Sequence, residues 1–186
     1  MKTVRASSRR LQQLKMNVVI ANRQRTKKIN ARLLKQIVGG LFAELKITEA
    51  ELGINLVAAP EMTLVNETFL QHEGSTDVIT FDHSGNGLPV SGRQNKSELP
   101  AGCWKHVHGE LFVCVDEAIL QARRFKTDWQ TEVVRYIVHG VLHLLGHDDR
   151  RAAARRKMKR EENRLVCVLV KRFTLAQLAR AAKLGA

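Results

Sequence analysis

The 186-residue sequence has no apolar run close to the roughly 20 residues that a helix needs to cross a bilayer. Its first 22 residues carry basic side chains but neither a long apolar segment nor a small-residue cleavage site, so the sequence predicts no signal peptide. It has only three cysteines, an odd number without CxxC spacing, which favours reduced thiols over a disulfide framework. Together these absences predict a cytoplasmic protein.

Acidic residues are also scarce. The chain has 18 Asp and Glu against 31 Lys and Arg, a net charge of +13, and its first 43 residues contain eleven basic side chains and no acidic one. A second basic cluster spans residues 150–162. Such a surface attracts phosphate backbones and releases their counterions. A merely solvated cationic surface and an anionic membrane are the alternatives, but no helix joins this charge to a broad aromatic and apolar face. The charge therefore favours nucleic acid as a partner and predicts no membrane.

Hydrophobic residues make up 44% of the chain, which indicates a globular protein, and its length suits one domain. Strands and helices are predicted to mix without strict alternation and without an internal repeat, which favours a single α+β domain with a small mixed four-stranded sheet. Residues 82–108 are rich in Gly, Ser, Asn and Pro and predict a long loop. Strands are expected at 16–22, 52–60, 75–81 and 109–115, and helices at 29–46, 61–70, 116–125, 128–146 and beyond about residue 151.

The predicted central helix at 128–146 carries two histidines four residues apart. Asp128 is the expected N-cap, and Gly146 is the expected C-terminal stop. At 100° per residue His139 and His143 share one face, away from the apolar face, which is the geometry by which an HxxxH pair chelates one metal ion. Two histidines at this spacing are also common on solvated helix faces. A turn at Gly146 would let residues 147–149 fold back and supply a third ligand.

The stretch HGVLHLLGHDD at residues 139–149 resembles the HGxLHLxGYDH signature of the YbeY family of endoribonucleases. Two further segments, 66–82 and 108–122, are similar to family segments in the same order and spacing, so the resemblance spans about residues 16–165. The segments outside it are then a basic N-terminal arm at 1–15 and a C-terminal helical extension at 166–186.

The resemblance implies a metal-dependent endoribonuclease that cleaves single-stranded RNA in the maturation of small-subunit ribosomal RNA and in ribosome quality control. Its expected partners are ribosomal RNA and the ribosome or small-subunit assembly factors. The family signature implies one zinc ion per chain, held by three histidines.

Position by position, the first two family ligands fall on His139 and His143, and the third falls on Asp149 in place of histidine. Aspartate is a competent zinc ligand, and its oxygen also suits Mn or Fe. His147 occupies the family's tyrosine position and competes as the third ligand, although the glycine before it should break the helical register.

A second departure is Leu70, where the family typically has an arginine. Leucine cannot hold a phosphate, so either another basic residue supplies the charge or the activity is altered. This keeps open a non-catalytic RNA-binding assembly factor with a structural metal. A metalloprotease-like hydrolase is another alternative, but Gly140 stands where an HExxH motif has its glutamate base.

No general acid or base is assigned from the sequence. Glu132, Tyr136, Thr76 and Asp77 are candidates to line a pocket near the metal, and Glu110 is ambiguous. An ordinary helix surface and strand-end hydrogen bonds would explain these residues equally well.

Overall fold

A computed structural model describes residues 15–84 and 105–179. Its four-stranded sheet has the order β1-β2-β4-β3. β1, β2 and β4 are parallel, and β3 pairs antiparallel with β4. The predicted α+β domain with a mixed four-stranded sheet is therefore confirmed. The strands are β1 (Lys15–Asn22), β2 (Ile47–Val57), β3 (Val78–Asp82) and β4 (Lys105–Cys114).

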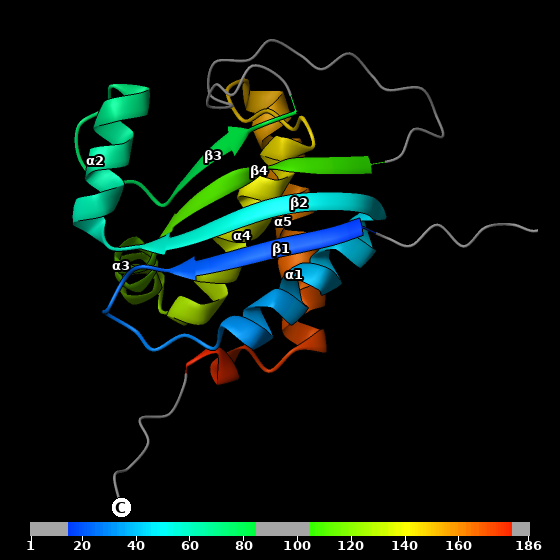
Figure 1. Cartoon of the computed structure of the whole chain (residues 1–186), viewed down its shortest axis with the longest axis horizontal. Coiled ribbons are helices and arrows are strands. Elements are labelled where there is room, and N and C mark those ends of the chain that lie inside the picture. Colours follow the sequence, from blue (N-terminus) through cyan, green and yellow to red (C-terminus); the bar gives the residue numbers. More distant parts are fainter. Residues whose placement is uncertain (1–14, 85–104, 180–186) are drawn as a thin grey trace, which may run out of the picture.

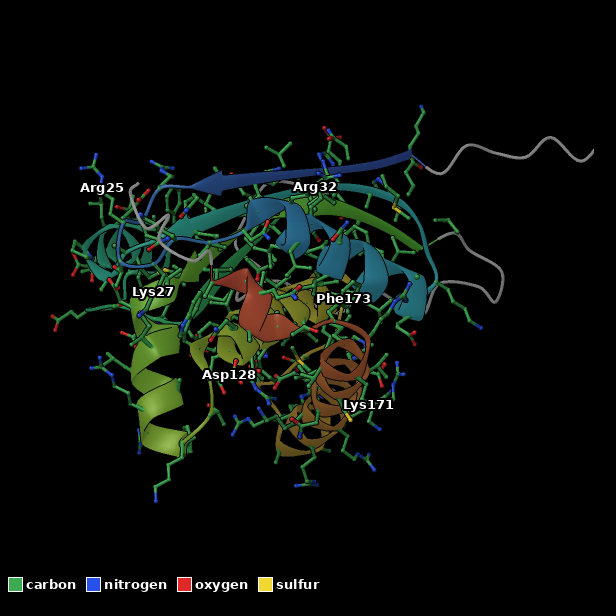
Figure 2. All side chains as sticks on the ribbon, turned by 90° about the horizontal axis from the view of Figure 1, so that it is seen from below. Arg25, Lys27, Arg32, Asp128, Lys171 and Phe173 are labelled. Atoms are coloured by element: carbon green, nitrogen blue, oxygen red, sulfur yellow. The ribbon has the colours of Figure 1, made fainter. Side chains whose placement is uncertain are left out.

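α1 and α4 cover one face of the sheet, and α5 packs against both of them (Figure 1); the edge-on view shows all three helices below the sheet (Figure 2). The main core lies between this layer and the sheet. α2 packs near one end of the sheet through a smaller apolar cluster that includes Met62 and Phe81. The helices are α1 (Ala31–Leu45), α2 (Ala59–Leu70), α3 (Val115–Phe125), α4 (Trp129–Leu144) and α5 (Ala152–Arg172), followed by a 3₁₀ turn at Leu175–Leu178.

Two strands begin earlier than predicted. β2 starts at Ile47 and not at residue 52, and β4 starts at Lys105 and not at residue 109. Glu49 and Glu51 are exposed, while Leu52 and Ile54 are buried against the helices. Successive strand residues point to opposite faces, so charged residues on the open face belong to the strand even though they interrupt its apolar run. Most of the predicted loop, residues 85–104, lies outside the described residues.

The C-terminal part of α5 is anchored to α1. Figure 2 shows Phe173, just after α5, beside α1, and a Cβ at Gly40 of α1 would lie 2.8 Å from the Phe173 ring. Val166 and Leu169 of α5 are buried in the main core, so the helix continues through the predicted boundary at residue 165. The division into an arm, a domain and an extension stays a prediction. Within the described residues, no helix is both long and apolar enough to span a membrane.

Candidate metal centre

The sequence of α4 fixes how the helix begins and which way it faces. The Asp128 side chain accepts a hydrogen bond from the Thr131 backbone N–H at 2.8 Å, so the predicted N-cap is confirmed. Gly140 faces the sheet at very close range, since a Cβ there would lie 2.6 Å from Leu111 Cδ2. The apolar side of α4 is thus pressed against β4, and the histidines lie on the side that is only partly buried.

The end of α4 turns the chain back over the histidines. Gly146 has φ of 88°, a conformation that glycine adopts without steric cost. Its N–H donates to the His143 carbonyl at 2.8 Å, and the His147 N–H donates to the Leu142 carbonyl at 3.0 Å. These two bonds form a Schellman motif, so Gly146 ends the helix as predicted. The turn places Asp149 beside the two histidines.

Three side chains converge after this turn. The Nε2 atoms of His139 and His143 are 3.0 Å apart, and Asp149 Oδ2 lies 3.8 Å from each of them. In the part of the chain that the structure describes, these three side chains form the one group of at least three His, Cys, Asp or Glu residues whose ligand atoms all lie within 4.8 Å of one another. They are close enough to hold a metal ion. That they do so, with Asp149 as the third ligand, stays a proposal.

The outer nitrogen of each imidazole has its own partner. His139 Nδ1 lies 3.1 Å from Glu162 Oε2, and His143 Nδ1 lies 3.0 Å from the backbone oxygen of His147. A carboxylate and a carbonyl can only accept, so each Nδ1 carries the hydrogen, and in the neutral imidazoles each Nε2 then carries a lone pair. Two such lone pairs at 3.0 Å repel unless a proton or a metal ion lies between them. This donor set fits a divalent metal with nitrogen and oxygen ligands.

His147 contributes to this arrangement through its backbone. It lies outside the converging group of side chains, and its carbonyl orients the His143 ring. Burial lowers the pKa of His143, and the neighbouring His139 lowers it further. A lowered pKa favours the neutral imidazole, which is the form that binds a metal.

Glu162 of α5 is the buried anchor of the site, and the sequence analysis missed it. Its side chain is 4% exposed, and its Oε1 accepts from Arg135 Nη1 and from Lys159 Nζ, both at 2.7 Å. Burial alone would raise the pKa of this carboxyl. Hydrogen bonds from His139, Lys159 and Arg135 outweigh it and lower the pKa to about 2. A sequence signal existed, because Glu162 lies at helical spacing between the apolar residues Met158 and Leu165.

A cavity of about 320 Å³ opens beside the metal centre, between α3, α4, α5 and the segment before β3. Of the predicted lining residues, Asp77, Glu132 and Tyr136 contribute to its wall. Thr76 is not among the lining residues, and its hydroxyl donates to Asp77 Oδ1 at 3.2 Å. Glu110 accepts from Asn55 Nδ2 at 2.7 Å, next to Gly53 of the sheet.

Leu70, at the position of the family's arginine, has an apolar role. It packs against the cluster around Met62, Ile79 and Phe81. Arg135, Arg155 and Lys159 are the basic side chains that line the cavity beside the metal centre.

Comparison with known proteins agrees with this fold. A family profile described as endoribonuclease YbeY matches residues 19–169. A protein named endoribonuclease YbeY from Salinibacter ruber is 33% identical over 99 residues, which cover 53% of this chain and 57% of that protein. The relative of the same name from Chlamydia pneumoniae is 27% identical over 166 residues, covering 88% of this chain and 97% of that protein.

A solved structure with low sequence identity also shares the fold over most of this chain. The solution structure of a Thermotoga maritima protein superposes with a TM-score of 0.58 at 19% identity, covering 91% of this chain and 99% of that one. This likeness supports the fold alone. The match to the Salinibacter protein, by contrast, spans less than two thirds of its length. The family profile covers most of the present chain, and the chain therefore belongs to the endoribonuclease YbeY family.

Proposed function

We propose that the chain is a metal-dependent endoribonuclease specific for single-stranded RNA. The observation that carries the proposal is the convergence of the Nε2 atoms of His139 and His143 and the Asp149 carboxylate beside an open cavity. The name shared by the relatives and the net charge of +13 support an RNA substrate. A bound divalent ion would supply Lewis acidity to a phosphoryl oxygen.

The chain's own residues hold and orient this centre. His139, His143 and Asp149 are the proposed ligands of one zinc ion, and the carboxylate also suits Mn or Fe. Glu162 and the His147 carbonyl fix the two imidazoles with their Nε2 atoms inward. Arg155 and Lys159, which line the cavity, attract the phosphate backbone in place of the arginine that Leu70 replaces.

The proposed biological setting follows from the family resemblance. It comprises the maturation of small-subunit ribosomal RNA, quality control of ribosomes in the cytoplasm, and contact with the ribosome or small-subunit assembly factors.

A non-catalytic RNA-binding factor with a structural metal is the main alternative. A structural zinc normally has four protein ligands. The converging group among the described residues has three, which favours a site with an open coordination position and hence catalysis. A metalloprotease is disfavoured by packing, since a glutamate at position 140 would collide with Leu111 and Thr80.

The test is metal content, measured by mass spectrometry, together with cleavage of single-stranded RNA, in the wild type, Asp149→Ala and His147→Ala. We expect Asp149→Ala to lose both metal and cleavage. His147→Ala should keep both, because its contact with His143 is made by the backbone. A wild type that binds metal and cuts no RNA would contradict the enzyme and favour the assembly factor.

A further inference from the structure

The cavity beside the metal centre has features that the metal ligands do not explain. His139 and Asp149 of the metal centre line it, together with Asp77, Gln121 and Phe125 from other elements. Its volume of about 320 Å³ is near the lower limit for ligand sites. A single nucleotide is of suitable size, and a duplex is not.

The charge of the cavity depends on the metal. Three basic side chains, of Arg135, Arg155 and Lys159, and four carboxylates line it. A divalent ion at the histidines changes the formal sum from negative to positive. Arg155 lies next to the proposed ligand, since its Nε donates to the Asp149 backbone oxygen at 2.8 Å. A bound divalent ion therefore makes the cavity more favourable for an anionic group.

Two buried polar atoms belong to residues of the cavity wall. The Tyr136 hydroxyl and Gln121 Oε1 have no hydrogen-bond partner among the described residues, and Tyr136 is only 5% exposed. Buried polar atoms are normally paired, so an unpaired set beside a cavity indicates a polar ligand. A hydroxyl that donates and an amide that can do both suit the edge of a nucleobase. Both atoms are buried, so a base reaches them only after side chains of the cavity wall move.

An exposed aromatic ring also lines the cavity. Phe125 ends α3, lines the cavity and is 63% exposed. Aromatic rings at such positions are the usual platforms on which unpaired bases stack.

We propose that this cavity seats one unstacked nucleotide of the RNA, next to the phosphodiester held at the metal centre. Arg155 and Lys159 contact its backbone, Phe125 stacks on the base, and Tyr136 and Gln121 bond the base edge. The inference rests on the proposed ribonuclease function and adds a binding site for the base.

The test uses nucleoside 5′-monophosphates, which contain no phosphodiester to cleave. Their binding to the zinc-loaded full chain is measured by calorimetry against ribose 5-phosphate, which lacks the base. We expect tighter binding of at least one nucleotide than of ribose 5-phosphate. Tyr136→Phe and Gln121→Leu should each weaken nucleotide binding about threefold to tenfold and leave ribose 5-phosphate unchanged.

Control variants separate binding from folding. Arg123→Gln changes an exposed residue of α3 that does not line the cavity, and it should bind like the wild type. Tyr136→Phe removes an unpaired buried hydroxyl, so its melting temperature should be unchanged or higher. The inference is overturned if nucleotides bind no tighter than ribose 5-phosphate, or if Tyr136→Phe and Gln121→Leu bind nucleotides like the wild type.

RNA cleavage by the same preparations distinguishes this inference from the proposed function. Base-dependent binding without cleavage of any single-stranded RNA contradicts the ribonuclease and keeps the nucleotide site. Cleavage without base-dependent binding contradicts the nucleotide site and keeps the ribonuclease.

Discussion

Two groups of histidines lie among the described residues, and of these only the pair in α4 has the geometry of a metal site. On the open face of the sheet, the His108 ring lies 5.5 Å from that of His83 and 6.1 Å from that of His106, and its Nε2 lies 3.7 Å from Glu51 Oε2. In α4, by contrast, the nitrogens of His139 and His143 approach to 3.0 Å. Strand neighbours two residues apart point in parallel, whereas helical residues four apart can aim at one point.

The second difference lies in what surrounds the rings. Each α4 histidine has an acceptor on its outer nitrogen, Glu162 or the His147 carbonyl, and is partly buried. His83 and His106 are exposed. The number of histidines is therefore a poor guide to metal binding. Nitrogen atoms that approach one point, on rings held by hydrogen bonds, are a better one.

The largest effect that separates the two groups should come from removing one proposed ligand. Loss of a residue that hydrogen-bonds a metal ligand weakens metal affinity by up to ~100-fold. His139→Ala is expected to weaken it more than this, because one of the three proposed ligands is removed. His106→Ala should leave metal affinity unchanged. Competition with a chelator of known affinity measures both variants. Equal losses in the two variants would mean that the sheet histidines bind the metal.

A large effect on stability should come from the carboxyl that anchors the α4 group. The pKa of Glu162 is lowered from 4.5 to about 2 in the folded chain, so the unfolded chain binds its proton first as the pH falls. Its contribution, about 3 kcal/mol, should be complete above pH 4.5 and lost as the pH falls toward 2. Urea denaturation of the metal-free chain between these values measures it. Glu162→Gln should be less stable near neutral pH and show a flatter pH dependence; identical profiles would contradict the assignment.

The same residue tests ring orientation. Glu162→Gln should weaken metal affinity about 10-fold to 100-fold, because the His139 ring loses its anionic partner. Glu161→Gln is the matched control one position earlier, where the side chain is 30% exposed and pairs with Arg164. Titration of the metal into both variants gives the comparison. A similar loss in Glu161→Gln would point to the overall charge of α5 and not to a specific contact.

The smallest effect should come from the turn that brings Asp149 to the histidines. Gly146→Ala places a Cβ at φ of 88° and should destabilise the chain by about 1 kcal/mol. Gly39→Ala, in the middle of α1 with no atom within 4 Å of the new Cβ, should instead stabilise it by up to about 1 kcal/mol. Thermal melts of the two variants should shift in opposite directions. Shifts of the same sign would show that the turn is not strained by alanine.

Local patterns predicted the parts of the site that depend on one helix. The shared face of His139 and His143 follows from helical spacing, and Asp128 and Gly146 follow from capping preferences. The distance from Asp149 to the histidines depends on the path of the chain after Gly146, which spacing does not encode. Glu162 was not predicted, because it reaches His139 only through the packing of α5 on α4. The two residues are 23 positions apart in the sequence.

The starts of β2 and β4 also could not be predicted from the local pattern. Glu49 and Glu51, like His106 and His108, lie on the side of the sheet opposite to α1 and α4. Because these polar residues interrupt the apolar runs, the apolar pattern placed the starts of β2 and β4 too late in the sequence.

The Schellman turn also makes the end of α4 a reporter of the bound ion. The amides of Gly146 and His147 are hydrogen-bonded within this turn, and both lie between the proposed ligands His143 and Asp149. An ion that bridges those two side chains closes the segment into a ring, and local opening of the ring then requires release of the ion. Hydrogen exchange at these two amides should therefore slow as the metal concentration rises, and the exchange rates would give the occupancy of the site without any substrate.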